Sequence, residues 1–290
     1  MSLRSIRSSM LSTKTKGVIA IIMSAFGFAL MGLFVRLADD YGGAISSYQK
    51  SFFRNLVAFV IALTAFARAG RTANLPWMLL FSRSALGTIG IFANFYALSH
   101  VPIAEAQTLN KTAPFFTVLF AGLFLKERIS RRQMFTLILA FFGAVLVAKP
   151  GFAGAETQPL MLGLLSGACA GGAYACVRAL RNRAVEPSLI ILVFSAFSCL
   201  ASLPFILVHY DPMTLPQVII LLGAGVGAAI GQFGITLAYG YAAPREISVY
   251  DYTSILFSAA LGFLFLAQIP DIWSVVGFGA ILLAAKRQRG

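Results

Sequence analysis

Charge is scarce in this 290-residue chain: charged residues make up 11% of it, and only 10 residues are acidic. Hydrophobic residues make up 59%, and the mean hydropathy is +0.83. A soluble domain of this size cannot bury that much apolar side chain in one core. The composition therefore excludes an ordinary globular protein and predicts that lipid is the solvent for most of the chain.

Histidine and cysteine are also rare, with two and three copies. His100 and His209 both fall at the ends of predicted membrane spans, and the HExxH, GxSxG and Walker A patterns do not occur. The cysteines lie inside predicted spans without CxxC spacing, which indicates neither a disulfide framework nor a metal site. We therefore expect no enzymatic activity, no metal and no cofactor, and any transport must be driven by a gradient rather than by ATP.

Apolar runs of about 20 residues, the length that crosses a bilayer as a helix, recur along the chain. Polar and helix-breaking clusters separate them into ten predicted spans: 17–38, 45–67, 76–98, 103–124, 133–149, 160–180, 187–208, 215–240, 246–266 and 270–285. The sequence thus predicts an all-α integral membrane protein with very short loops.

The net charge of +13 would suggest a nucleic-acid partner in a soluble protein, but the placement of the charges argues against one. Only Arg36 and Lys149 flank the spans on one side of the predicted membrane. Sixteen basic residues flank them on the other: Arg4, Arg7, Lys14, Lys16, Arg68, Arg71, Lys126, Arg128, Arg131, Arg132, Arg181, Arg183, Arg245, Lys286, Arg287 and Arg289. Basic loops face the cytoplasm, so we expect both termini to be cytoplasmic and the protein to lie in the cell membrane, as in a bacterial inner membrane.

Residues 1–16, MSLRSIRSSMLSTKTK, form a basic, serine-rich arm before the first span. Such a composition is also typical of an organellar transit peptide. We favour a disordered cytoplasmic arm, because its charges obey the same rule as the loops.

An internal repeat organises the spans. Residues 104–125 return 141 positions later as residues 245–266, so that Thr112 matches Thr253 and Asn110 meets the near-isosteric Asp251. Five spans in each half mean that the second copy inserts upside down. We therefore predict two inverted five-helix repeats, 17–150 and 160–286, around a central cavity, which is the architecture of alternating-access transporters.

Ionisable side chains in the middle of a span cost about 2.5–3.5 kcal/mol each, so those present usually face water, a partner or a substrate. Lys50, Arg83 and Arg178 lie near span ends, where their long stems can reach the interface. Arg54 and Lys111 are harder to place there, because each lies about 12–15 Å into its span at 1.5 Å per residue. Both are predicted to lie close to the midplane.

Polar stripes follow three of the spans, and they predict a shared aqueous cavity. Span four carries Gln107, Asn110, Lys111 and Pro114 on one helical face, span nine carries Asp251 and Tyr252, and span two carries Arg54. Pro114 frees a backbone carbonyl one turn back and marks a helix break or gate. The candidate substrate-binding residues are Arg54, Asn94, Gln107, Asn110, Lys111, Tyr174, Gln232, Asp251 and Tyr252. The alternative is a buried structural network in which Asp251 pairs with Arg178 or Lys111.

Three segments carry a resemblance to a known family. The stretch NKTAPFFTVLFAGLFLKE (110–127) resembles the fourth span of EamA-type members of the drug/metabolite transporter superfamily, and SFFRN (51–55) resembles their second span. YTSILFSAALGFLFLAQIP (252–270) is similar to the matching segment of the second repeat, with Ile255 where proline is usual and Gln268 where glutamate is usual. The resemblance covers residues 17–285 and implies ten helices in two inverted repeats.

These observations predict a secondary or facilitative carrier. Arg54 and Lys111 against Asp251 alone favour a small polar solute with a carboxylate or phosphate, such as an amino acid. Asp251 can receive an amino group or carry a proton. The alternative is an exporter of amphipathic or cationic compounds by proton antiport, and the sequence leaves direction and oligomeric state open.

Overall fold

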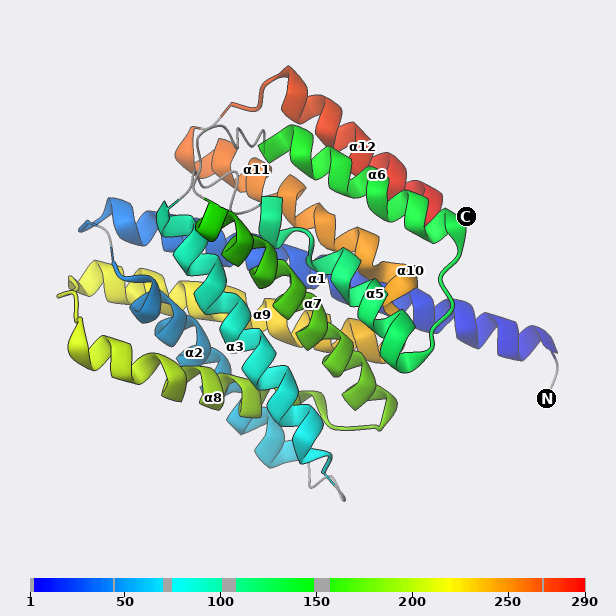
Figure 1. Cartoon of the computed structure of the whole chain (residues 1–290), viewed down its shortest axis with the longest axis horizontal. Coiled ribbons are helices and arrows are strands. Elements are labelled where there is room, and N and C mark those ends of the chain that lie inside the picture. Colours follow the sequence, from blue (N-terminus) through cyan, green and yellow to red (C-terminus); the bar gives the residue numbers. More distant parts are fainter. Residues whose placement is uncertain are drawn as a thin grey trace.

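The computed structural model describes residues 3–43, 45–69, 75–100, 108–148, 157–267 and 269–289, and every regular element within these ranges is a helix (Figure 1). In chain order the elements are α1 (Leu3–Asp40), α2 (Ser47–Ala69), α3 (Trp77–His100), α5 (Ala113–Leu125), α6 (Arg131–Ala148), α7 (Thr157–Asn182), α8 (Pro187–Val208), α9 (Leu215–Tyr241), α10 (Pro244–Ile247), the 3-10 helix η1 (Ser248–Tyr252), α11 (Thr253–Leu266) and α12 (Ile272–Arg289). The prediction of an all-α protein is confirmed.

Eight segments of the described chain are long and apolar enough to cross a membrane: Thr13–Asp40, Ser47–Ala69, Thr108–Leu125, Arg131–Ala148, Thr157–Asn182, Pro187–Val208, Leu215–Tyr241 and Pro244–Leu266. Helices α3 and α12 occupy the two remaining predicted spans but do not belong to this set. The protein is a multi-pass membrane protein, and the count of ten spans stays a prediction.

The N-terminal arm differs from its prediction. Helix α1 begins at Leu3 and extends beyond the other helices at its N-terminal end (Figure 1), so the expected disorder of residues 3–16 is wrong. This stretch contains neither glycine nor proline and leads directly into the apolar run. Because a helix already formed in the span lengthens without a new nucleation step, the arm continues it.

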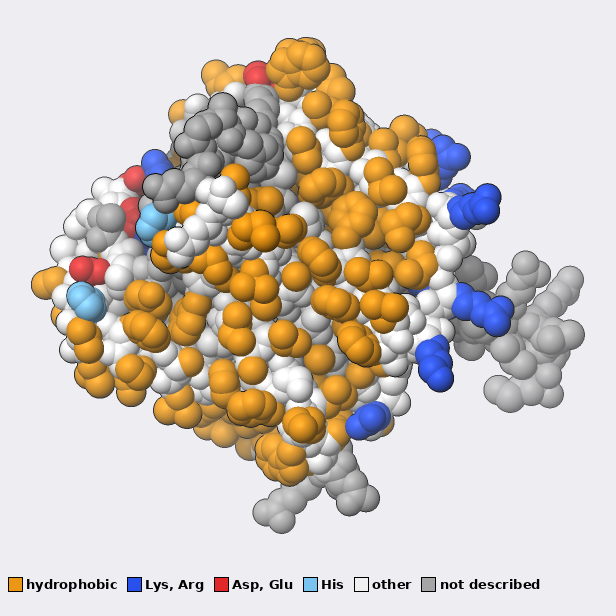
Figure 2. Space-filling model, in the orientation of Figure 1, with side chains coloured by type: hydrophobic (Ala, Val, Ile, Leu, Met, Phe, Trp, Pro, Cys, Tyr) orange, Lys and Arg blue, Asp and Glu red, His pale blue; other side chains and the backbone are white. Residues whose placement is uncertain are grey.

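The surface carries the pattern of a bilayer-spanning protein. Figure 2 shows hydrophobic side chains across the middle of one face, Lys and Arg at the edge toward the C-terminus, and acidic side chains with histidine toward the opposite edge. Large apolar side chains such as Met78, Phe124 and Leu207 are more than 70% exposed. Exposure of this extent fits contact with hydrocarbon rather than water.

Helices from the two halves of the chain pack against each other through small residues. Helix α1 lies along α9, and α3 lies along α7. A Cβ added at Gly27 of α1 would lie 2.6 Å from the backbone nitrogen of Gly231 and 2.8 Å from the carbonyl oxygen of Gly227. A Cβ at Gly90 of α3 would lie 3.3 Å from the carbonyl oxygen of Ser166 on α7. Apolar surface gives no drive to associate in lipid, so this close backbone approach supplies the packing.

The remaining helices complete the bundle in pairs. Helix α2 packs on α8, and α6 lies beside α12 (Figure 1). The α6–α12 pair meets at two glycines, because a Cβ at Gly143 would lie 2.7 Å from the carbonyl oxygen of Gly277. Helix α5 contacts α7, and α11 contacts α1.

Both copies of the repeated segment contain an irregular turn at the same place. In the first copy residues 111–112 form a turn before α5, and in the second copy η1 precedes α11. The Thr112 hydroxyl donates to the Leu109 carbonyl at 2.6 Å, and the Thr253 hydroxyl donates to the Tyr250 carbonyl at 2.6 Å. These residues are 141 positions apart, so one hydroxyl-to-carbonyl bond recurs in both turns.

The two copies also end alike. Lys126 and Ala267, again 141 positions apart, have positive φ angles of 56° and 52° and terminate α5 and α11. Their backbone N–H groups donate to the carbonyls of Ala121 and Gly262. This left-handed cap normally belongs to glycine, because other residues meet a steric cost there.

Replacing Ala267 by Gly should therefore stabilise the protein by about 0.5–1 kcal/mol, the relief of the left-handed strain less the added entropy of the unfolded chain. Thermal unfolding in detergent measures the change. Ala260→Gly, at an exposed helical position of α11, is the matched control and should destabilise by about 1 kcal/mol. Equal loss of stability in both variants would contradict this reading of the cap.

Candidate functional site

Several ionisable side chains inside the bundle are paired. Lys50 Nζ lies 2.8 Å from Asp39 Oδ2, and Arg178 Nε lies 3.0 Å from Glu127 Oε1. Arg178 also donates from Nη1 to the Tyr239 carbonyl at 2.9 Å. Both long side chains end on acidic partners at helix ends, with 13% and 17% of their surface exposed, and their expected position at the membrane interface stays a prediction.

Arg83 departs furthest from its prediction. Its side chain is 1% exposed, donates from Nη2 to Gln232 Oε1 at 2.9 Å, and lies over the Phe194 ring with Cζ 3.6 Å from the centroid. The prediction that the Arg83 side chain reaches the membrane interface is therefore wrong. Gly87, one turn further along α3, provides the space for the Arg83 guanidinium, because a Cβ at this position would lie 2.6 Å from Arg83 Nη1. An arginine followed by a glycine four positions later is the one signal in the sequence that points to this arrangement.

Arg54 of α2 belongs to the same region. Its Nε is buried and has no hydrogen-bond partner, as is also true of Arg83 Nε. The two guanidinium groups are close enough to interact electrostatically with each other and with Tyr174 of α7. Within the described part of the chain, neither arginine forms a salt bridge.

Lys111 and Asp251 meet at the two irregular turns. Lys111 Nζ donates to Ser254 Oγ at 2.6 Å and lies 3.9 Å from Asp251 Oδ2, with the two side chains 22% and 13% exposed. The Tyr252 hydroxyl donates to the Lys111 carbonyl at 2.9 Å. The alternative of an Asp251–Lys111 contact therefore holds as geometry, whereas Arg178 has Glu127 as its partner. At 3.9 Å the contact is long for a charge-assisted hydrogen bond.

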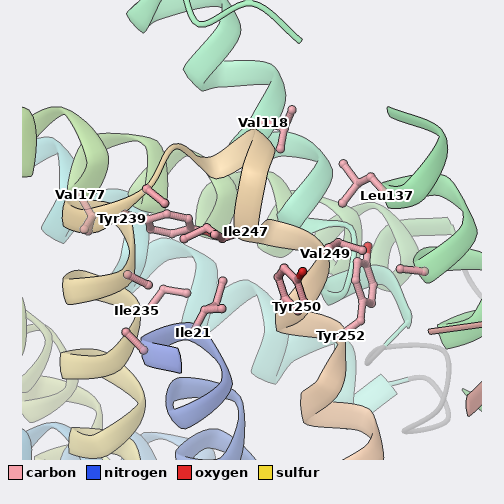
Figure 3. Close-up of a cluster of buried hydrophobic side chains, with 14 of the residues drawn as sticks. Ile21, Val118, Leu137, Val177, Ile235, Tyr239, Ile247, Val249, Tyr250 and Tyr252 are labelled. Carbon is pink, nitrogen blue, oxygen red and sulfur yellow. The ribbon is translucent and has the colours of Figure 1, made fainter. Parts of the chain in front are cut away.

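Tyrosines connect the arginines to this contact. Tyr174 and Tyr239 have ring centroids 5.9 Å apart, and Asp251 is within electrostatic range of both. Tyr239, Tyr250 and Tyr252 belong to the same apolar core as Ile235 and Ile247, and Tyr239 lies beside Ile247 (Figure 3). Tyr252 is fully buried and its hydroxyl is already used, so it positions the turn at Lys111.

Arg54, Arg83, Lys111 and Asp251 are here called the polar centre. The other candidate residues differ in their surroundings. Asn110 Nδ2 donates to Ser166 Oγ at 3.1 Å, and the Oδ1 of Asn94 on α3 is buried without a hydrogen-bond partner. Pro114 lies in the first turn of α5, where a helix does not need its N–H. Gln107 lies outside the described residues.

One end of the bundle is tied by polar contacts. The Arg178–Glu127 pair joins α7 to the end of α5, Arg245 Nη1 donates to the Arg128 carbonyl at 2.7 Å, and Gln288 Nε2 donates to the Arg245 carbonyl at 2.7 Å. These residues belong to the side that the basic loops assign to the cytoplasm. The contacts link elements from both halves of the chain.

Comparison with known proteins agrees with a transport role. Residues 15–149 match the model of the EamA-like transporter family. The pseudopaline exporter CntI of Pseudomonas aeruginosa is 29% identical over 273 residues, which cover 93% of this chain and 94% of that protein. A riboflavin transporter of Brucella anthropi is 26% identical over 82% of this chain and 87% of that protein. A solved structure described only as "Crystal structure of protein" has a TM-score of 0.80 at 17% identity and covers 96% of this chain and 97% of that one, which shows a shared fold.

Proposed function

We propose that this chain is a membrane transporter of the EamA-like family, as the family match and the named relatives support. It is a ten-helix carrier built from two inverted repeats, 17–150 and 160–286, with residues 1–16 as a basic cytoplasmic arm. The helix contacts between the two halves support the repeats. The α1–α9 contact corresponds to the α3–α7 contact, and the α5–α7 contact corresponds to the α1–α11 contact. Each contact has a counterpart in which the halves are interchanged. Two such modules around a central site make alternating access the mechanism.

The distribution of charge supports the orientation. The basic edge toward the C-terminus (Figure 2) and the basic loops indicate cytoplasmic termini. The named relatives are bacterial, which favours the inner membrane of a bacterium.

The solute is a small polar metabolite with a carboxylate or phosphate. One observation carries this proposal: Arg54 is inside the bundle, beside Tyr174, and no carboxylate of the described chain pairs with it. An unpaired charge in such surroundings is costly unless a ligand neutralises it. Arg54 binds the anionic group, Lys111 is a second cation at the turn, and Asp251 takes an amino group or a proton. Asn94 and Asn110 supply neutral hydrogen bonds nearby.

A second candidate is an exporter of amphipathic or cationic compounds by proton antiport. It is favoured by the long Lys111–Asp251 contact of 3.9 Å, which a cation can replace at Asp251, and by the adjacent Tyr174–Tyr239 pair. The relative named as a pseudopaline exporter is consistent with export.

Counterflow in proteoliposomes against amino acids, organic acids, phosphate esters and cations distinguishes the two candidates. We expect anionic solutes to exchange and cations to compete weakly, because the described centre carries excess positive charge. Exchange confined to cations would replace the first candidate by the second. In the same vesicles, single cysteines at residue 2 and in the 126–132 loop should react with an impermeant thiol reagent from one and the same side.

A further inference from the structure

Arg54 and Arg83 are left without an acidic partner when the ion pairs of the described residues are assigned. Lys50 has Asp39, Lys111 has Asp251, and Arg178 has Glu127. Arg54 and Arg83 have no carboxylate partner within the described part of the chain. The carboxylates of these three pairs have other partners, so no acidic side chain of the described residues neutralises Arg54 or Arg83.

The two arginines are held in a way that fits a ligand rather than a random burial. Gln232 accepts one N–H of Arg83, and the Phe194 ring supports the face of its guanidinium. Both contacts are neutral, so they orient the cation without cancelling its charge. Arg54 of α2 is within electrostatic range of Arg83, and the Nε atoms of both side chains are buried with no hydrogen-bond partner.

Two like charges within reach of each other repel, and this repulsion is strongest in surroundings that exclude water. The second repeat does not offset this repulsion, because the counterparts of Arg54 and Arg83 at the offset of 141 positions are the uncharged Ser195 and Ala224. The excess charge is thus confined to the first half of the chain. Such a pair is stable when a dianion lies between its members.

We infer that the transported solute bears two negative charges, which Arg54 and Arg83 neutralise together. The inference rests on the proposed carrier function and narrows its substrate class from any anionic metabolite to a dianion, either a dicarboxylate or a phosphomonoester. Gln232 and Phe194 are positioning residues, because they hold the guanidinium of Arg83 toward the solute. Monoanions bind one arginine and leave the other uncompensated.

The test uses pairs of solutes that differ by one charge at nearly constant shape. Counterflow of succinate is compared with that of succinamate in the dicarboxylate arm, and counterflow of methyl phosphate with that of dimethyl phosphate in the phosphomonoester arm. We expect wild-type protein to prefer the dianionic member of the dicarboxylate or the phosphate arm by about tenfold or more, since one charge-assisted interaction separates the members. The arm that shows the preference identifies the chemistry.

Variants assign that preference to the arginines. Arg54→Gln and Arg83→Gln should each lower exchange of the dianion about ten- to hundredfold and reduce its preference over the monoanion, whereas Arg83→Lys keeps the charge and should keep part of the preference. Arg68→Gln, at an exposed site of α2, is the matched control and should behave as wild type. If Arg83→Gln fails to fold, Gly87→Ala, which displaces the guanidinium, replaces it.

Equal exchange of monoanions and dianions by wild-type protein, or an unchanged preference in Arg54→Gln, would overturn the inference and leave an anion carrier in place. Failure of every anion to exchange, with uptake of cations, would remove the proposed function as well. The two failures are therefore distinct.

Discussion

Replacement of Lys111 by Met is expected to lower counterflow of an anionic solute by more than a hundredfold. Lys111 is a cation at the turn between the two halves of its span, and its Nζ contacts Ser254 and lies 3.9 Å from Asp251. Removing it deletes one positive group of the centre and leaves the Asp251 carboxylate without its partner. Breaking a buried pair from one side costs about 3–5 kcal/mol, so the stability of the single variant should also fall.

A double variant separates these two effects. Lys111→Met combined with Asp251→Asn removes both charges, so it should regain most of the lost stability and none of the transport. Lys126→Met, at the exposed end of the same segment, is the control for loss of one lysine. Uptake kinetics of Lys111→Met equal to those of the wild type would contradict the assignment of Lys111 to the substrate site.

Replacement of Gly27 by Ala is expected to cause a clear loss of stability. The new Cβ would lie 2.6 Å from Gly231 N and 2.8 Å from Gly227 O, and backbone atoms of α9 cannot rotate away as a side chain does. Overpacking of this kind costs about 1–3 kcal/mol and here separates α1 from α9.

Gly32→Ala on the same helix is the matched control, because a Cβ there meets no atom within 4 Å. Its only effect is on helix propensity, which favours Ala by about 1 kcal/mol. Thermal unfolding in detergent should therefore shift in opposite directions for the two variants. A downward shift of equal size in both would show that the close approach of α1 and α9 is not the cause.

The helices of this protein follow closely from its sequence, because the bilayer dictates both their length and their composition. The internal match between Thr112 and Thr253 correctly pairs two positions with the same local hydrogen bond. Pro114 predicts a helix break, and the chain turns at residues 111–112 before α5 begins at Ala113 with the proline in its first turn. The second copy has Ile255 at the matching position, so this signal is missing for η1.

The polar centre follows from the sequence only in part, because depth along a helix does not specify direction. Arg54 and Lys111 were selected for depth, and Arg83 was excluded by the same criterion because it is near a span end. Its partner Gln232 is 149 residues away, and no local pattern predicts such a contact. The basic arm differs from its prediction for another reason: the placement of its charges indicates a cytoplasmic side but does not decide whether the arm is helical, and a helix already formed in the span extends at little cost.

The pairing of α1 with α9 and of α3 with α7 has a consequence for how the chain must be assembled. Each half has a glycine-lined helix surface that packs against the other half, so neither half alone forms the complete packed core. A chain severed between α6 and α7 would yield two fragments that are individually unstable in the bilayer and recover a native bundle only when synthesised together. During biosynthesis, α1 and α3 remain without their packing partners in the bilayer until α7 and α9 have been inserted.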